Sequence, residues 1–480
     1  MSLIVLSDEI IGDLLENLAR EEVEDIAEAL KTALHEYSTG TQAGDADISH
    51  QPEQTSIYSD RSRATTIFMP LTSPAGDGVK VVTVSSLHAD PSLPTFKPTG
   101  SLTLHSPEGN PIGLLCAQTI TAFRTALASS CLLTKRANVR TLTVFGAGLQ
   151  AYWHIRLALM LRGSTIRVVN IINRRFSDNA KEILGRLYAM PVEVKEREGW
   201  AAAQFSLLTP GYGEYGRLQK ENIRAADVIY CCTPSNEELF DASILTNHEG
   251  RKKGRLIIAI GSYAREMREL PVELLIQVTR PHQPGHLHYH KHATEGGVVI
   301  VDSLKGALQE AGEIIDAGLE PKQLVELGEL IMIKRQAAED SSSSQALTGE
   351  DSLPESFDKL DVTPASSVME SESGGSRSGN GGRSSSQSPL RLKRDGDTGV
   401  TQPASLTGLH IPVLRRLKST TNRHSSTDEK NDDHLSRWMT SGNVIYKSVG
   451  LGLMDLVVGL EVIKLADAKG MGARVENFSR

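Results

Sequence analysis

Short runs of apolar and β-branched residues recur through the middle of the chain, and most are followed by a turn and a helical pattern. The runs cover residues 141–145, 166–172, 227–232, 256–261 and 298–302. Apolar runs of this length without alternation are typical of strands that are buried on both faces of a parallel sheet. The pattern therefore predicts an α/β fold, with a Rossmann-type doubly wound parallel sheet over residues 131–305.

The first third of the chain has a mixed pattern. Residues 3–6 predict a short strand, and Asp8 can cap the helix that follows. From Leu18 onward, apolar residues follow helical spacing until Gly40. Residues 41–60 are polar, and we predict a loop there. The pattern beyond this loop predicts strands at 65–69, 79–84 and 102–104 and a helix at 119–133.

Residues 338–440 differ from the rest of the chain in composition. Ser, Gly, Asp, Glu and Arg dominate them, so they cannot bury enough apolar surface to offset the entropy lost on ordering. We predict a disordered low-complexity insertion. Apolar patterns return as a strand at 443–447 and a helix at 453–468, which Gly470 and Gly472 end. This terminal segment is expected to pack against an earlier domain.

Composition and charge exclude several classes of protein. The net charge of −8 gives no overall attraction to nucleic acid or to an anionic membrane, and aromatic residues make up only 5%. The N-terminus lacks the basic region of a secretory signal, and no apolar run approaches the roughly 20 residues of a membrane span. Four cysteines in 480 residues do not form a disulfide framework. We therefore expect a cytoplasmic protein that binds neither nucleic acid nor membrane.

The turn after the first central run carries the strongest chemical signal. Gly146 suits a tight turn, Gly148 allows close approach of a pyrophosphate, and Ala151 permits a helix to pack on the strand. The helix that opens near Gln150 then offers free N–H groups to phosphate. An ordinary strand–helix turn is the alternative. The predicted cofactor contacts in this turn are Gly146, Ala147, Gly148, Leu149 and Gln150.

The ends of the next strands suggest which dinucleotide is bound. The run 166–172 ends in Asn173-Arg174-Arg175, where a cofactor without a 2′-phosphate usually meets an acid. Because guanidinium groups pair well with a phosphate dianion, NADP(H) is preferred and NAD(H) is the alternative. The two arginines can also lie on a solvated helix start. Thr233 follows the strand 227–232 at the same edge and is a further predicted contact.

Two stretches, residues 208–217 and 280–297, are predicted surface insertions. The second carries His286, His288, His290 and His292 in alternation, which on an extended chain would place four imidazoles on one face. Neither an acid nor a cysteine stands among them, and neighbouring prolines indicate a loop. We favour a solvated loop over a Zn²⁺ or Ni²⁺ site and predict no metal centre.

Seven short motifs occur in a fixed order along the chain. They are Phe68-Met69-Pro70, Gly78-Val79-Lys80, residues 121–126, residues 146–151, Ile260-Gly261 with Glu269-Leu270, Val301-Asp302 with Glu310-Ala311-Gly312, and residues 447–450. In these motifs the chain resembles the ornithine cyclodeaminase/μ-crystallin family. The resemblance covers nearly everything except residues 338–440 and the His-rich insertion.

The resemblance implies a domain organisation and a partner. Beside the Rossmann domain it implies a discontinuous α+β substrate and dimerisation domain, whose sheet forms a homodimer contact. We expect residues 1–130, 306–337 and 441–480 to form this domain. It also implies a nicotinamide cofactor at the Gly146 turn, with Ser448 and Gly450 near the nicotinamide and Thr125 facing the phosphates.

The resemblance further implies that Lys80 and Arg124 hold a substrate carboxylate. Chemistry agrees, because Arg grips a carboxylate with two parallel hydrogen bonds and Lys adds a mobile point charge. Both residues can border a cleft between the domains, and Lys80 is also a candidate proton donor. Without the resemblance, Lys80 would be interpreted as a surface strand lysine.

Three positions depart from the family pattern. Gln54 stands where the family usually has a third carboxylate-binding Arg, and Arg61 or Arg63 is the candidate replacement. Ile67 stands where ornithine-specific members have a Glu for the side-chain amine. Tyr263 stands where they have a proton-transferring Asp, and a Tyr with a reference pKa of about 10 is a poor base. We therefore expect Tyr263 to shape the pocket.

These departures undermine ornithine cyclisation but leave hydride transfer intact. The sequence hypothesis is an NAD(P)(H)-dependent oxidoreductase that reduces a small imino acid or oxidises an amino acid. One alternative is an ornithine cyclodeaminase, an ammonia-lyase that forms proline, with displaced acids. Another is an NADPH- or ligand-binding protein without turnover.

Overall fold

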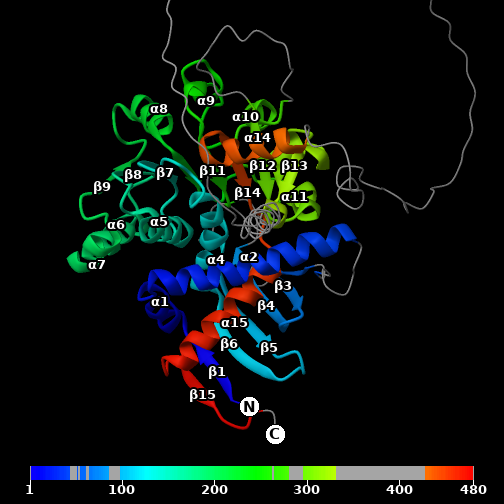
Figure 1. Ribbon diagram of the computed structural model, residues 1–480. Coiled ribbons are helices and arrows are strands. Elements are labelled where there is room, and N and C mark those ends of the chain that lie inside the picture. Colours follow the sequence, from blue (N-terminus) through cyan, green and yellow to red (C-terminus); the bar gives the residue numbers. More distant parts are fainter. Residues whose placement is uncertain are drawn as a thin grey trace, which may run out of the picture. The chain divides into compact units, whose positions relative to one another are not determined.

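The computed structural model of the protein describes residues 2–43, 51, 54–60, 64–85, 98–261, 264–280, 296–330 and 428–478 (Figure 1). These residues form two β-sheets with helices packed on them. All of them fall within one structural unit, residues 1–341 together with 422–480. The α/β fold class that the sequence predicts is confirmed.

The larger sheet has eight strands in the order β13-β12-β14-β11-β10-β7-β8-β9, and all pairs are parallel. Its strands are β7 (Thr141–Phe145), β8 (Val168–Ile172), β9 (Gln204–Leu208), β10 (Val228–Cys231), β11 (Leu256–Ala259), β12 (Gly297–Val301), β13 (Leu324–Glu326) and β14 (Asn443–Lys447). Strand order reverses at β7, because β8 and β9 lie on one side of it and β10 and β11 on the other. This is the doubly wound topology, and ligands bind beyond the carboxyl ends at such a switch point.

Helices cover both faces of this sheet (Figure 1). They are α5 (Leu149–Arg162), α6 (Asp178–Ala189), α7 (Val192–Glu198), α8 (Tyr215–Ala225), α9 (Ser243–Thr246), α10 (Val272–Val278), α11 (Leu304–Glu310) and α12 (Gly312–Asp316). Successive residues of β10 alternate between two apolar clusters: Tyr230 and Cys232 face one, and Ile229 and Cys231 face the other. This burial on both faces explains the unbroken apolar runs, and it makes both cysteines core residues without a disulfide.

Strand β14 belongs to the parallel sheet, not to the domain expected for residues 441–480. It pairs with β11 on one side and β12 on the other. The short strand β13 extends the same sheet at its edge, although residues 306–337 were also expected in the substrate domain. The domain expected for both strands came from the family resemblance, and an apolar run by itself indicates that a strand is buried but not which sheet buries it.

Helix α14 (Asp428–Ser441) lies partly within the predicted insertion 338–440. Met439 is buried, and Leu435 and Trp438 pack against the main apolar cluster. Nη1 of Arg136 donates to the carbonyl oxygens of Trp438, Met439 and Gly442 at 3.0, 3.2 and 3.0 Å, which satisfies the end of the helix. These contacts order a segment whose polar composition predicted disorder. Residues 331–427 lie outside the described part of the chain.

The smaller sheet has seven strands in the order β15-β1-β6-β5-β4-β3-β2. They are β1 (Leu3–Leu6), β2 (Thr55–Ser59), β3 (Ala64–Ser73), β4 (Gly76–Ser85), β5 (Thr99–His105), β6 (Pro111–Cys116) and β15 (Ala473–Val475). Helices α1 (Asp8–Glu16), α2 (Arg20–Ala43), α4 (Ala117–Leu133) and α15 (Gly452–Ala468) accompany it. The C-terminal helix α15 contacts β3, α2 and α4, so the chain end does pack against its beginning.

Several local predictions near the N-terminus need correction. Ser7, not Asp8, caps α1 by accepting from the Ile10 N–H, while Asp8 accepts from the Thr119 N–H at the start of α4. Helix α2 continues past Gly40, since one glycine costs only about 1 kcal/mol, which packing against the core offsets. Strand β2 lies in the predicted loop 41–60, where cross-strand pairing with β3 overrides a polar sequence.

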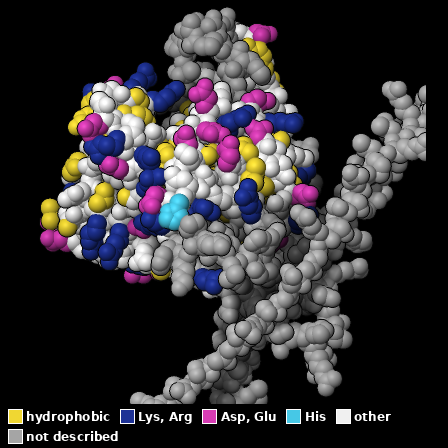
Figure 2. Space-filling model, turned by 90° about the horizontal axis from the view of Figure 1, so that it is seen from above, with side chains coloured by type: hydrophobic (Ala, Val, Ile, Leu, Met, Phe, Trp, Pro, Cys, Tyr) yellow, Lys and Arg dark blue, Asp and Glu magenta, His cyan; other side chains and the backbone are white. Residues whose placement is uncertain are grey.

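The surface agrees with the charge argument. Figure 2 shows Lys and Arg side chains interspersed with Asp and Glu side chains over the coloured surface. No helix in the described ranges is long and apolar enough to cross a lipid bilayer.

Candidate functional site

The turns after β7 and β10 meet at the carboxyl edge of the parallel sheet. Gly146 has a φ of +103°, and a Cβ there would stand 2.7 Å from the carbonyl oxygen of Cys232 and 3.0 Å from Oγ1 of Thr233. Only glycine allows this approach without strain. The structure therefore brings Gly146 and Thr233, two predicted cofactor contacts, together at the switch point.

Helix α5 begins at Leu149 without a side-chain cap. Its N-cap is Gly148, and no atom lies within 4 Å of the position that a Cβ would take there. Oε1 of Gln150 is buried and has no hydrogen-bond partner among the described residues. Uncapped N–H groups and the positive helix end suit phosphate, and an unpaired acceptor suits a hydroxyl. Together with the buried Ala147, this turn fits the pyrophosphate and ribose of a dinucleotide.

The loop after β8 presents two exposed guanidinium groups. Asn173 ties the loop down: its backbone N–H donates to the Leu208 carbonyl at 3.0 Å, and its Nδ2 donates to the Arg175 carbonyl at 2.7 Å. Arg174 and Arg175 are both exposed. Because β8 is the neighbour of β7, these arginines stand on the side of the switch point where sequence analysis predicted the 2′-phosphate.

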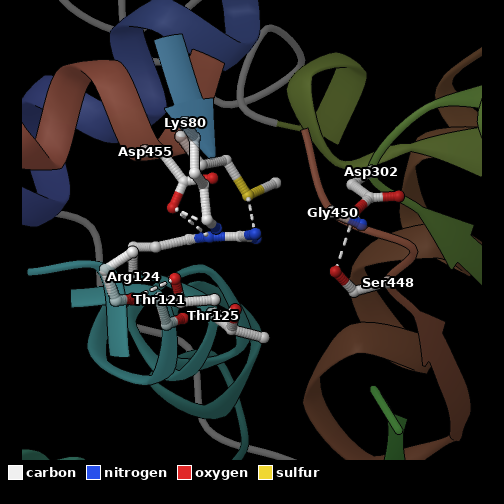
Figure 3. A network of polar contacts seen from close by, with 10 residues as sticks. Lys80, Thr121, Arg124, Thr125, Asp302, Ser448, Gly450 and Asp455 are labelled. Carbon is white, nitrogen blue, oxygen red and sulfur yellow. Dashed lines mark hydrogen bonds and ion pairs between the residues drawn. The ribbon is translucent and has the colours of Figure 1, made fainter. Parts of the chain in front are cut away.

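Lys80, Arg124 and Asp455 form a buried ion cluster (Figure 3). Nζ of Lys80 on β4 lies 2.9 Å from Oδ1 of Asp455 on α15, and Nε of Arg124 on α4 lies 3.3 Å from the same oxygen. Lys80 and Arg124 are 3% and 4% exposed, and Asp455 is fully buried. The two residues predicted to hold a carboxylate are thus brought together, on a carboxylate that sequence analysis had missed.

Burial and charge act against each other on the protons of this cluster. Burial lowers the pKa of Lys80 below its usual value, and the charge of Arg124 acts in the same direction while Asp455 opposes both. Burial by itself raises the pKa of Asp455, but Arg124 and Lys80 outweigh it and leave this pKa below its usual value. Asp455 is therefore ionised at neutral pH, and Lys80 releases its proton more readily than a surface lysine.

Arg124 turns the outer edge of its guanidinium toward the turn after β14. Among the described residues, the hydrogen bond of its Nη1 is to the Met454 sulfur, a weak acceptor, at 3.5 Å. Its Nη2 lies 2.9 Å from the position of a Cβ on Gly450, whose φ is +91°. A side chain at position 450 would be strained and would press on this edge. Glycine thus keeps the Nη1–Nη2 edge of Arg124 open for a planar anion.

Asp302 holds the turn that carries Ser448 and Gly450 (Figure 3). Its Oδ2 accepts from Oγ of Ser448 and from the Gly450 N–H, both at 2.7 Å, and its Oδ1 accepts from the Ser303 N–H at 3.1 Å. Asp302 is fully buried at the end of β12. One carboxylate therefore fixes the turn that the family resemblance places near the nicotinamide.

Glu269 holds the turns after β10 and β11 through hydrogen bonds to their backbone. It accepts from the Thr233 N–H at 2.9 Å and from the Gly261 N–H at 2.6 Å. Nζ of Lys447 lies 3.9 Å from Glu269 and 3.1 Å from Glu313, and all three side chains are fully buried. Burial raises the pKa of Glu269 to about 8, although Lys447 and the two N–H groups act in the opposite direction.

The remaining predicted residues have separate surroundings. Thr125 is buried, and its hydroxyl donates to the Thr121 carbonyl inside α4 at 2.8 Å. Gln54 donates to Glu310 at 3.1 Å. Tyr263 lies outside the described residues, as do the four alternating histidines. Among the described residues, no group of three or more His, Cys, Asp or Glu side chains is arranged to bind a metal.

The sequence pattern does not single out Asp455 or Glu313, and it contains Lys447, Glu269 and Asp302 only as residues of the family motifs. The sequence does contain one sign of these buried charges. Asp455 stands inside an otherwise apolar run, and Lys447 stands at the end of another. A charge in a buried element requires a partner of opposite charge. The partners lie hundreds of residues away along the chain, so the pattern indicates the charge but not its partner.

Comparison with known proteins decides the family. A profile of the ornithine cyclodeaminase/mu-crystallin family matches residues 14–209. An uncharacterized protein of Saccharomyces cerevisiae is 30% identical over 292 residues, which are 56% of this chain and 70% of that protein. The chain belongs to the ornithine cyclodeaminase/mu-crystallin family.

Two further proteins are similar to this chain, one in sequence and one in fold. A Δ1-pyrroline-2-carboxylate reductase of Bacillus cereus is 25% identical over 294 residues, covering 59% of this chain and 71% of the reductase. An archaeal alanine dehydrogenase dimer with bound NAD superimposes with a TM-score of 0.56 at 18% identity, covering 100% of each chain. At that identity the superposition shows the fold.

Proposed function

We propose that the protein is an NADP(H)-dependent oxidoreductase that reduces a small α-imino acid, or oxidises the amino acid in the reverse direction. One observation carries the proposal. Two buried cations, Lys80 and Arg124, converge from separate elements, and the free edge of Arg124 faces the Gly450 turn. That turn stands at the carboxyl edge of the parallel sheet, where the strand ends would hold the dinucleotide.

The bound reduced nicotinamide would supply a hydride to the imine carbon. Arg124 would hold the substrate carboxylate through Nη1 and Nη2, and Lys80 would add its charge. Nζ of Lys80 would first give a proton to the imine nitrogen, and as the carbon of the resulting iminium accepts the hydride, the C=N π electrons would move to nitrogen and leave a neutral amine. The lowered pKa of Lys80 suits this transfer. Glu269 and Asp302 would act as positioning residues that hold the surrounding turns.

The apolar environment supports an imino acid over ornithine. Ile67 pairs with Val82, and Met69 pairs with Lys80, across adjacent antiparallel strands. Residues two apart on a strand share a face, so Ile67 and Lys80 lie on the same face of the sheet. An apolar side chain therefore stands where ornithine-specific members place the acid that receives the second amine. The name of the Bacillus cereus relative, a reductase of a cyclic imino acid, points the same way.

A spectrophotometric assay tests the proposal. The full-length protein is mixed with NADPH and a panel of cyclic and open-chain imino acids, and oxidation is followed by the loss of absorbance. Oxidation that Lys80→Ala abolishes is the expected result. Tight NADPH binding without turnover over the whole panel would instead identify a binding protein, and proline with ammonia from ornithine would identify a cyclodeaminase.

The coenzyme preference can be tested at the exposed arginines. Arg174→Ala, alone or with Arg175→Ala, is expected to weaken NADPH binding by about 10- to 100-fold, because a charge-assisted hydrogen bond is worth about 1.5–3 kcal/mol. NADH affinity should change less than threefold. Calorimetric titration with both coenzymes measures this, and Lys464→Ala on α15 is the control. Equal losses for the two coenzymes would show that these arginines do not read the 2′-phosphate.

A homodimer through the smaller sheet is also proposed. Its edge strand β2 carries Ile57 and Tyr58, which are 56% and 48% exposed. Among the described strands β2 has a partner on one side alone, and exposed apolar side chains on such an edge are typical of a surface that another chain covers. Light scattering of the purified protein should give twice the chain mass of 52.1 kDa. A monomer at micromolar concentration would exclude the dimer.

A further inference from the structure

Asp455 has one carboxylate oxygen in use and one without a partner. Oδ1 accepts from both Lys80 and Arg124. Oδ2 is buried and has no hydrogen-bond partner among the described residues. A buried, ionised oxygen without a donor is costly, so a donor from outside the described residues is expected at Oδ2. A ligand that brings an N–H group would supply the missing donor.

Asp455 does not use the Nη1–Nη2 edge of Arg124. Asp455 accepts from Nε, and in the described part of the chain Nη1 has no acceptor stronger than the Met454 sulfur. A carboxylate that binds Nη1 and Nη2 displaces this sulfur, which sits on an unbranched and adaptable side chain. The cluster therefore offers two groups to a ligand. One is the Nη1–Nη2 edge of Arg124, which can donate two hydrogen bonds. The other is Oδ2 of Asp455, whose Oδ1 is bonded to Nε of the same arginine.

We infer that Asp455 is the residue that selects a nitrogen-bearing substrate, by accepting a hydrogen bond at Oδ2 from the α-nitrogen of an imino or amino acid. The inference rests on the proposed function. In such a molecule the carboxylate and the nitrogen are bonded to one carbon, so one guanidinium and its bound carboxylate can receive both. An α-keto acid has no N–H to offer and leaves Oδ2 unpaired. The site should thus discriminate imino acids from keto acids of the same shape.

Asp455 also fits the chemistry of the proposed reduction. After Lys80 delivers its proton, the nitrogen carries an N–H and, as an iminium, a positive charge. A carboxylate next to it stabilises that charge and keeps the imine carbon electrophilic toward hydride. The described charged groups that face Asp455 are Lys80 on β4 and Arg124 on α4. Asp455 is therefore the one acid of this cluster that can stabilise the charge on the substrate nitrogen.

The test compares two ligands that differ only in the nitrogen. L-Proline and cyclopentanecarboxylate have the same ring size and carboxylate, and calorimetry measures the binding of each to the full-length protein with NADP⁺ present. Wild type should bind proline about 10- to 100-fold more tightly, as expected for one hydrogen bond to a charged group. Asp455→Asn should remove this preference while cyclopentanecarboxylate binds as tightly as before or more tightly. Glu461→Gln, on the same helix, is the matched control.

Two results would overturn the inference. One is equal affinity of the wild-type protein for the two ligands, a measurement that does not depend on any variant folding. The other is an equal loss of affinity for both ligands in a folded Asp455→Asn protein, which would show that the role of Asp455 is purely structural. Imine turnover is scored separately. A proline preference without imine reduction would refute the proposed function alone, and reduction without the preference would refute this inference alone.

Discussion

Replacing Lys447 with methionine is expected to lower the free energy of unfolding by about 3–5 kcal/mol, the usual effect of removing one partner of a buried ion cluster. Methionine fills a similar volume, so the loss is mainly electrostatic. Lys447 is the cation that lies between Glu269 and Glu313, and all three side chains are fully buried. Without it, Glu269 and Glu313 are left in the core without the cation that both of them contact. Urea unfolding at pH 7 measures the change.

The same variant should become relatively more stable as the pH falls. Burial already raises the pKa of Glu269 to about 8, above its unfolded value, so the folded state binds a proton that the unfolded state releases. A raised carboxyl pKa makes the free energy of unfolding fall as pH rises between those two values. Loss of the Lys447 charge raises that pKa further, so the two proteins hold the same proton below about pH 8, and the penalty should be larger at pH 9 than at pH 7.

Two variants make this expectation decisive. Lys464→Met removes a lysine that is 69% exposed and paired with Glu461, and it should change stability by less than about 0.5 kcal/mol. Adding Glu313→Gln to Lys447→Met removes one of the two facing acids and should recover part of the loss. A Lys447→Met protein as stable as wild type at both pH values would contradict the assignment of an ionised cluster.

Replacing Arg124 with methionine is expected to reduce kcat/KM for an imino acid by about 100- to 1,000-fold, equivalent to about 3–4 kcal/mol of lost charged hydrogen bonds. Its Nη1–Nη2 edge is the only planar donor pair that the described cluster turns toward the Gly450 turn. Arg124→Lys keeps the charge but loses the paired geometry, so it should recover activity only partly. Initial rates at saturating NADPH measure both variants.

Coenzyme binding separates this effect from misfolding. NADPH affinity should stay within threefold in Arg124→Met, because the dinucleotide is proposed to bind at the Gly146 turn and not at Arg124. Arg217→Met is the control. Arg217 is exposed, and it forms ion pairs with Glu221 on its own helix α8 and with Glu214, which directly precedes that helix. Wild-type kcat/KM in Arg124→Met would contradict the carboxylate clamp.

Local regularity explains how much of the fold the sequence could predict. The helix expected at 119–133 is α4, and the turn at Gly146 joins β7 to α5, because apolar spacing and glycine placement act over a few residues. Strand β2 and helix α14 were not expected, since their polar sequences are ordered by contacts with distant segments. Of the candidate site, the sequence indicates Lys80, Arg124, Gly146 and Thr233, but it does not indicate Asp455, which joins Lys80 to Arg124.

By itself, the sequence determined the parallel-sheet architecture, the glycine turn at Gly146 and the residue types available for a carboxylate. Short-range pattern carries that information, because burial on both faces and tight turns each restrict which residues can follow one another. Only the tertiary structure decided that Asp455 joins Lys80 to Arg124, and that β14 enters the centre of the sheet to bring Lys447 between two acids. Charges are paired through space, and the low polarity of the core makes those pairings strong whatever their separation along the chain.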